Sequence, residues 1–398
     1  MKNNKVLLAF SGGLDTSFCL KYLSKDQKME VYSAIVNTGG FSSEELKDLE
    51  TKAYALGAIH HTCLEETNAY YEKIIKFLIF GNVLKNNTYP LSVSAERVHQ
   101  AIALAKYAKK TKVNYIAHGS TGAGNDQVRF DLIFQLIAPE IEIITPTRDL
   151  QLSREYEINY LSQNGFKSEW ESAEYSINKG LWGTSVGGKE TLTSFQPLPQ
   201  KAYPSQLKSK ESKLIKVEFK NGELCGLNRK KMHPIAIIQK INEIASEYAI
   251  GREMHVGDTI IGIKGRVGFE APAASIIIKA HHLLEKHTLS KWQLHYKEQM
   301  AGWYGMFIHE AQYLDPVMRD AESFLESTQK NVSGFVSIEL HPYRFEVLGI
   351  KSAHDLMNSE FAEYGETNKA WTAEDVKGFT KIIANPIQIF NKVNDIKC

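Results

Sequence analysis

The sequence predicts an α/β fold: a doubly wound parallel sheet in an N-terminal domain, followed by an α+β domain and a C-terminal helical tail. Three observations lead to this prediction. Short apolar runs alternate with amphipathic helical patterns over residues 1–165. Two of those runs end in glycine-rich loops. Beyond Gly165 the alternation fades. We therefore expect domains at 1–165 and 166–365, with an oligomerisation helix within 366–398.

The first strand and the loop after it lie at the start of the chain. Val6–Phe10 is an apolar, β-prone run, and Ser11-Gly12-Gly13 then forces a tight turn. Asp15, Thr16 and Ser17 are residue types that favour helix N-caps, and an amphipathic pattern follows them. A strand, a glycine turn and a helix start present free backbone N–H groups to an anion, so a phosphate site is expected here. The loop lacks the Gly-Lys-Ser/Thr ending of a Walker P-loop.

A second glycine-rich loop, His118–Asp126, follows another predicted strand. A flexible connector would explain the glycines of this loop, but it would not explain the closely spaced polar residues Thr121, Asn125, Asp126 and Arg129. In a parallel sheet, ligands bind at the carboxyl ends of the strands, so both loops should lie at one site. The strands expected after the first lie at 31–36, 59–64, 113–117 and 141–144, and the helices at about 44–56, 68–88, 95–110, 127–137 and 154–163.

The second half of the chain mixes strands and helices. Asn221-Gly222 between two apolar runs is a strong hairpin signal. Further elements are expected as helices at 234–249 and 271–286, a strand at 259–264, and a β pair at 332–340 and 343–350. The amphipathic pattern at 372–394 predicts a helix that docks on another subunit or packs on its own domain.

Composition restricts the class of protein. The 398 residues carry 47 basic and 46 acidic side chains, so nothing demands a nucleic-acid partner. No apolar run reaches 18 residues, the first strand leaves no room for a signal peptide, and the four cysteines are scattered. We expect a soluble cytoplasmic protein without a membrane partner. No metal site is expected at the histidines His281, His282, His287 and His295.

Three motifs, in this order, carry a family resemblance: Ala9–Ser17, His118–Phe130 and Tyr175–Ser185. The chain resembles argininosuccinate synthase, in the ATP pyrophosphatase (PP-loop) superfamily, essentially from end to end. The resemblance implies an adenine-nucleotide α-hydrolase-like N-terminal domain and a synthetase domain. It implies ATP-dependent ligation of citrulline and aspartate through citrullyl-AMP, giving argininosuccinate, AMP and pyrophosphate in arginine biosynthesis. It also implies Mg²⁺ and a homotetramer.

The resemblance also implies site residues, with Asp15 and Asp126 as the catalytic pair. ATP would be held by Ala9, Phe10, Ser11, Gly12, Gly13, Leu14, Asp15, Thr16, Ser17, Val36 and Gly119. Aspartate would be held by Thr121, Asn125 and Asp126, and citrulline by Tyr89, Ser94, Asn125, Arg129, Ser176 and Ser185. The Arg129 guanidinium suits a substrate carboxylate because its fork can bind at two points.

The chain departs from the family pattern at several positions. Val36-Asn37 stands where the family usually has Ala-Asp, and Gly122-Ala123-Gly124 lacks the usual central lysine. Gly257 and Phe269 fall where the family has a glutamate and a tyrosine that contact citrulline. Loss of the carboxylate leaves an α-ammonium unpaired. Either the acceptor is an N-acylated citrulline (N-acetyl or N-succinyl), or another group such as Asp258 or water substitutes.

Two other functions stay open from the sequence. A PP-loop tRNA-modifying enzyme would want a basic groove and, for thiolation, paired cysteines, and the chain has neither signal. A protein that binds ATP without chemistry would not need the additional substrate-like motifs.

Overall fold

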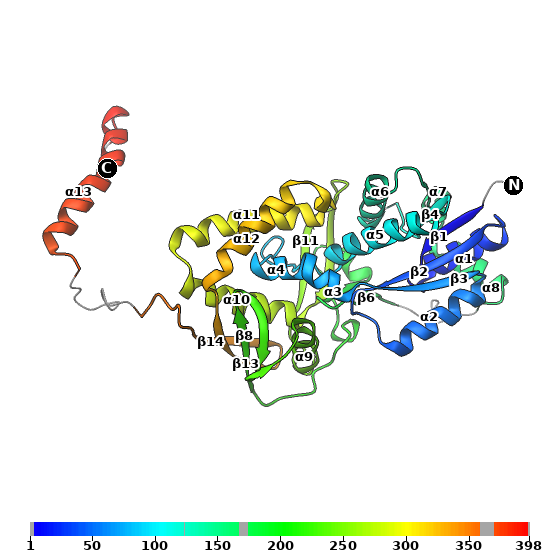
Figure 1. Cartoon of the computed structure of the whole chain (residues 1–398), viewed down its shortest axis with the longest axis horizontal. Helices are drawn as coiled ribbons and strands as arrows, with labels where there is room; N and C mark the ends of the chain where they lie inside the picture. Colours follow the sequence, from blue (N-terminus) through cyan, green and yellow to red (C-terminus); the bar gives the residue numbers. More distant parts are fainter. Residues whose placement is uncertain (1–3, 123, 167–173, 359–369, 397–398) are drawn as a thin grey trace. The chain divides into compact units, whose positions relative to one another are not determined.

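Five parallel strands form the first sheet, in the order β3-β2-β1-β4-β5 (Figure 1). The computed structural model describes residues 4–122, 124–166, 174–358 and 370–396. The strands are β1 (Lys5–Ala9), β2 (Glu30–Asn37), β3 (His60–Glu65), β4 (Tyr115–Ala117) and β5 (Glu142–Ile144). The chain turns from β1 to β2 on one side and reaches β4 on the other, so the topological switch point lies between β1 and β4. Ligands bind at such points, which places a site beside the two glycine loops.

Helices cover both faces of this sheet, as the doubly wound prediction requires. On β1, Val6 and Leu8 pack with one group of helices, and Leu7 packs with the other. The first group is α1 (Leu14–Lys25), α2 (Ser43–Leu56) and α8 (Arg154–Gln163); the second is α5 (Ser92–Thr111) and α6 (Asp126–Ile137). Apolar side chains on both faces explain why β1 is a nearly continuous apolar run.

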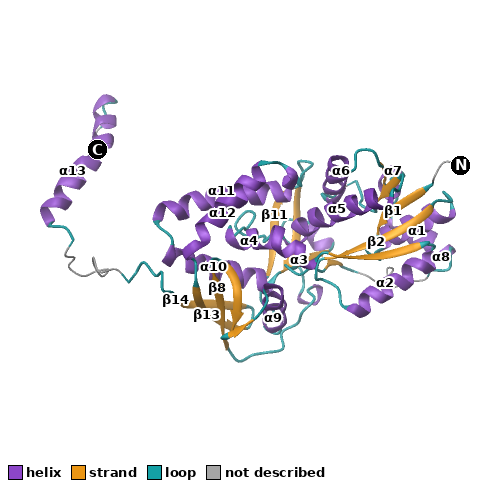
Figure 2. Ribbon diagram, viewed as in Figure 1, coloured by secondary structure: helices purple, strands orange, loops and turns teal. Residues whose placement is uncertain are grey.

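Two antiparallel sheets follow in the chain (Figure 2). One has the order β10-β9-β8-β13-β14 and the other β11-β12-β7-β6. Their strands are β6 (Ser176–Asn178), β7 (Thr184–Gly187), β8 (Lys213–Lys220), β9 (Glu223–Leu227), β10 (Lys230–Lys231), β11 (Arg252–Asp258), β12 (Lys264–Glu270), β13 (Gly334–His341) and β14 (Arg344–Lys351). The predicted α+β character of this part is confirmed.

The remaining helices complete residues Met1–Ala353, which form one compact unit. They are α3 (Thr67–Tyr70), a π-helical turn (Tyr71–Ile75), α4 (Lys76–Phe80), α7 (Pro146–Asp149), α9 (Pro234–Ser246), α10 (Pro272–Thr288), α11 (Lys291–His309) and α12 (Val317–Thr328), with short 3₁₀ turns at Lys189–Leu192, Gln200–Ala202, Gln312–Leu314 and Gln329–Asn331. The predicted division of this part at residue 165 stays a prediction, as does the boundary at 365.

Two local expectations are corrected by the structure. Of the predicted strand 259–264, only Lys264 lies on a strand; residues 259–263 are the turn between β11 and β12, where Thr259 Oγ1 donates to the carbonyl of Ile263 at 2.8 Å. Apolar side chains alone suggested a strand there, but Ile261 and Ile263 are exposed. Helix α1 is capped by Gly13 rather than by Asp15, Thr16 or Ser17. Helices α11 and α12 and strands β6 and β7 had not been predicted.

The unit His354–Cys398 contains one described helix, α13 (Ala373–Val393), which confirms the helix predicted at 372–394. Thr372 and Asp375 form a capping box at its start. Its apolar residues include Phe379, Ile382 and Ile383. Among the described residues of this unit there is no second helix or strand that could cover them.

Candidate functional site

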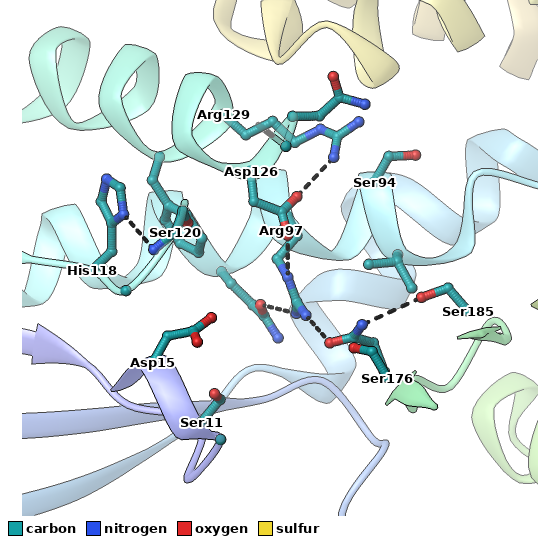
Figure 3. A pocket seen from close by; sticks show the side chains of 18 of the residues that line it. Ser11, Asp15, Ser94, Arg97, His118, Ser120, Asp126, Arg129, Ser176 and Ser185 are labelled. Carbon is teal, nitrogen blue, oxygen red and sulfur yellow. Dashed lines mark hydrogen bonds and ion pairs between the residues drawn. The ribbon is translucent and has the colours of Figure 1, made fainter. Parts of the chain in front are cut away.

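A cavity of about 830 Å³ lies at the carboxyl ends of the parallel strands. Its walls come from the loops after β1 and β4, from α5, and from the sheet that contains β7, β11 and β12. The two glycine-rich loops therefore meet at one site, as their positions in the sequence predicted. In Figure 3, Ser11 and Asp15 lie on one side of this space and Asp126 and Arg97 on the other.

The two loops are in direct contact through Gly119. A Cβ atom added to Gly119 would lie 3.0 Å from both the carbonyl carbon of Asp15 and the nitrogen of Thr16. Only glycine permits the second loop to approach the start of α1 this closely. Ser11 Oγ and Thr16 Oγ1 lie 3.3 Å apart, and both residues line the cavity.

Gly12 and Ser17 do not line the cavity, although both belong to the predicted ATP-binding set. Gly12 has φ +75°, and a Cβ atom there would lie 2.1 Å from Leu49 of α2. The Ser17 side chain is fully buried, and its hydroxyl donates to the Gly12 carbonyl at 3.4 Å. Lys52 Nζ donates to the same carbonyl at 2.6 Å. These groups support the loop from behind, so Gly12 and Ser17 shape the cavity wall without lining it.

The second loop is held by bonds on both sides. The Ser120 N–H donates to His118 Nδ1 at 3.2 Å (Figure 3). On the other side of the ring, His118 Nε2 lies 2.8 Å from Asp131 Oδ1. Asn125 Oδ1 accepts from the Ile260 N–H at 2.8 Å, which ties the loop to the β11–β12 turn. Ala123, the residue at the place of the family's lysine, lies outside the described residues.

Asp126 lies between two guanidinium groups. Arg97 Nε donates to Asp126 Oδ2 at 3.2 Å, and Arg129 Nη1 donates to Asp126 Oδ1 at 2.8 Å. Desolvation opposes ionisation of Asp126, but the two guanidiniums outweigh it and lower the pKa of this carboxyl. Asp126 is therefore an anion at neutral pH, and each arginine keeps further N–H donors that can meet another carboxylate.

Arg97 also links the walls of the cavity. Its Nη2 donates to Asn178 Oδ1 at 3.0 Å, and Asn178 Nδ2 donates to Ser185 Oγ at 3.5 Å. Ser94 lies on the same face of α5, three residues before Arg97, and Ser176 lies on β6 (Figure 3). The chain thus brings α5, α6 and the β6–β7 hairpin to one polar centre.

The far end of the cavity is formed by Tyr89, Arg129, His255, Gly257 and His309, which we call the acceptor end. The rings of Tyr89 and His255 stack with centroids 5.2 Å apart. The carbonyl of His309 accepts from Arg129 Nε and Nη2, both at 3.1 Å. Phe269 does not line the cavity; it is 1% exposed and packs behind the Tyr89 ring.

All other predicted site residues line this single cavity: Ala9, Phe10, Ser11, Gly13, Leu14, Asp15, Thr16, Val36, Tyr89, Ser94, Gly119, Thr121, Asn125, Asp126, Arg129, Ser176 and Ser185. The roles assigned to them stay predictions.

Sequence reasoning missed Arg97, Arg154, Lys179, His255 and His309, which also line the cavity. The i,i+3 spacing of Ser94 and Arg97 could have signalled Arg97. No pattern in the sequence around His309, the last residue of α11, indicates that it belongs to the site.

Two family models match the chain. The argininosuccinate synthase N-terminal HUP domain matches residues 5–167, and the argininosuccinate synthase C-terminal domain matches residues 175–390. The chain belongs to the argininosuccinate synthase family. This confirms the resemblance and the fold predicted from it.

Relatives of the argininosuccinate synthase family match over almost their whole length. The chain is similar to the argininosuccinate synthase of Methanocaldococcus jannaschii, at 35% identity over 90% of this chain and 91% of the relative. It is 34% identical to that of Xanthomonas campestris pv. campestris over 99% and 100% of the two chains, and 35% identical to that of Dictyoglomus thermophilum over 96% of each.

None of the described helices has the length and apolar character needed to cross a bilayer. The described residues contain one group of side chains spaced for a metal ion, Glu339, His341 and Glu346 on the β13–β14 hairpin. This group does not line the cavity, and Glu346 is paired with Arg344.

Proposed function

We propose that the chain is an ATP-dependent carbon–nitrogen ligase that joins citrulline and aspartate, giving argininosuccinate, AMP and pyrophosphate. One observation carries the proposal: two glycine loops in contact border one cavity, and Asp126, at the end of the second loop, lies there between Arg97 and Arg129. The loops suit a triphosphate, and the guanidiniums suit the carboxylates of amino-acid substrates.

The proposed reaction has two steps. A ureido oxygen is a poor leaving group, so it first attacks the α-phosphorus of ATP, and pyrophosphate leaves. The amine of aspartate then attacks the activated ureido carbon, AMP leaves with the oxygen, and the amine loses a proton. Together the two steps need three substrates held in a fixed orientation, and they need fixed hydrogen-bond donors around the phosphates. The backbone of residues 11–16 and Gly119 would supply those donors, and Asp126 would accept from the amine of aspartate.

Mg²⁺ would accompany ATP. The Asp15 carboxylate lines the cavity beside the Ser11 and Thr16 hydroxyls, and such oxygen donors fit a hard cation. The bound ion would neutralise charge on the phosphates. We further propose a cytoplasmic homotetramer in arginine biosynthesis, in which the apolar face of α13 packs against another copy of the chain.

The deciding experiment is pyrophosphate release from ATP and aspartate across a panel of ureido acceptors, with labelled AMP followed in parallel. Release that requires both aspartate and a citrulline-type acceptor supports the proposal. Release that requires tRNA, or no release with any acceptor, contradicts it. The relatives are named for argininosuccinate, the product that free citrulline gives; the panel includes N-acylated forms because Gly257 stands where the family has a glutamate.

A further inference from the structure

The acceptor end of the cavity contains two buried imidazoles. His255 and His309 are each 6% exposed. Burial lowers the pKa of His255, and burial together with the nearby Arg129 lowers the pKa of His309 to about 3. Both side chains are therefore uncharged at neutral pH, and neither can serve as a cation or as an anion for a substrate.

Each of these imidazoles keeps one unsatisfied atom. The Nδ1 atoms of His255 and His309 are buried and have no hydrogen-bond partner among the described residues. Buried polar atoms are normally paired, and leaving one unpaired costs free energy. Both residues line the cavity, and a neutral imidazole has one N–H donor and one acceptor nitrogen, so these side chains suit an uncharged hydrogen-bonding group of a substrate.

The carboxylates of the cavity are already engaged or lie elsewhere. Asp126 is held by Arg97 and Arg129, and in the proposed reaction its remaining acceptor capacity is taken by the amine of aspartate; the exposed Asp258 is 2.6 Å from Lys264 Nζ. The full set that lines the cavity is Asp15, Glu45, Asp126 and Asp258, with Asp15 beside the glycine loops and Glu45 in the capping box of α2. The alternative in which Asp258 replaces the family's glutamate therefore requires breaking an ion pair.

The remaining charges at this end are positive. Arg129 is one, and Lys85 is close enough to help lower the pKa of both His255 and His309. Gly257 offers no side chain, and a Cβ atom there would lie 2.7 Å from His255 Nε2, so the imidazole occupies the space that a longer side chain would need. A substrate ammonium at this end would lie among cations without a free carboxylate, which is unfavourable.

We propose that the acceptor end selects a citrulline whose α-nitrogen is acylated, so that an uncharged amide takes the place of the ammonium. The inference rests on the proposed function and concerns only the group on the α-nitrogen. The amide N–H and the acyl carbonyl can bond to the neutral imidazoles of His255 and His309.

The first test compares citrulline, N-acetylcitrulline and N-succinylcitrulline in pyrophosphate release with ATP and aspartate. We expect kcat/KM to be at least about tenfold higher for an N-acyl form than for citrulline, since a site lacking the partner for a charged group rejects it strongly. Equal or better turnover of free citrulline would overturn the inference and leave the proposed function standing. No release with any of the three would overturn both.

The second test moves a carboxylate into the acceptor end. Gly257→Glu is made together with His255→Ala, which removes the imidazole that would collide with it. The matched control carries His255→Ala with Val256→Glu, because Val256 lies next to Gly257 on β11, is 53% exposed and does not line the cavity. We expect the first pair to shift the kcat/KM ratio toward free citrulline by about tenfold or more, relative to the control. An unchanged ratio in two folded variants would count against the inference, and the substrate panel on the unmodified protein decides the matter if either pair fails to fold.

Discussion

At the scale of single residues, charge balance dominates the candidate site. Asp126 satisfies two guanidiniums at once, and its ionised form depends on them. Removing one member of such a set leaves the other charges uncompensated. The free-energy cost of the uncompensated charge exceeds the contribution of any single hydrogen bond in the set.

We therefore expect Asp126→Asn to lower kcat/KM for aspartate by about 30-fold or more, equivalent to roughly 2 kcal/mol. The amide keeps the shape of the side chain but leaves Arg97 and Arg129 without their anion. Initial rates of pyrophosphate release measure the effect. Glu346→Gln is the control, because it removes an exposed ion pair far from the cavity. Equal loss in both variants would show that Asp126 has no special role.

His309 gives a prediction about pH. Its folded pKa, about 3, lies below its ordinary value of 6.5. Between these values the unfolded chain binds more protons than the folded one, so stability rises with pH and is lost as pH falls. We expect His309→Gln to flatten the decline of Tm between pH 6.5 and 4 compared with the unmodified protein. The exposed His60→Gln should follow the unmodified curve, and parallel curves for all three proteins would contradict the assignment.

At the scale of elements, the site depends on two loops that touch. The β1–α1 loop and the β4–α6 loop belong to strands that are neighbours in the sheet but more than a hundred residues apart in the chain. Their contact at Gly119 is between backbone atoms, which cannot move aside as a flexible side chain can.

Gly119→Ala should consequently weaken ATP binding by about tenfold or more, since the added methyl group forces the loops apart by a few tenths of an ångström. Gly122→Ala is the matched control on the same loop: the closest atom to its added Cβ is Arg148 Cγ, at 3.8 Å. Isothermal titration with ATP measures both. Similar dissociation constants for the two variants would indicate that the loops do not grip the nucleotide together.

At the scale of the whole molecule, a buried polar network joins segments distant in sequence. Lys297 Nζ lies 2.6 Å from Glu285 Oε2 and donates to the Phe80 carbonyl at 2.8 Å, and Lys297 and Glu285 are both fully buried. His281 and Gln329 extend the network, with His281 Nε2 3.0 Å from Gln329 Oε1. The network connects α4, α10, α11 and the turn after α12.

Lys297→Met should lower the stability by about 3 to 5 kcal/mol, because Glu285 becomes an uncompensated buried charge. Adding Glu285→Gln should recover part of the loss, since the second change removes that charge. Thermal unfolding monitored by circular dichroism compares the variants. A double variant less stable than Lys297→Met alone would contradict this account.

The proposed assembly gives a further prediction at this scale. An amphipathic helix cannot bury its apolar face by itself, so deleting residues 372–398 should produce a smaller assembly than the full chain. Light scattering after size-exclusion chromatography measures the mass. Replacing the exposed Lys377 by alanine is a control that leaves the apolar face intact, and an unchanged mass after deletion would exclude this role for α13.

The sequence by itself determined the parallel sheet, both glycine loops and part of the cavity lining, because each depends on a local pattern. Apolar runs, the glycine turns and the Asn221-Gly222 turn all act through neighbouring residues. Tertiary structure alone decided that Ser17 faces inward, that 259–263 is a turn, and that Arg97, His255 and His309 join the site. These features depend on which surfaces meet after folding. The His309 carbonyl, for example, accepts from Arg129, which lies 180 residues away in the chain, and the residues around His309 on α11 do not indicate this contact.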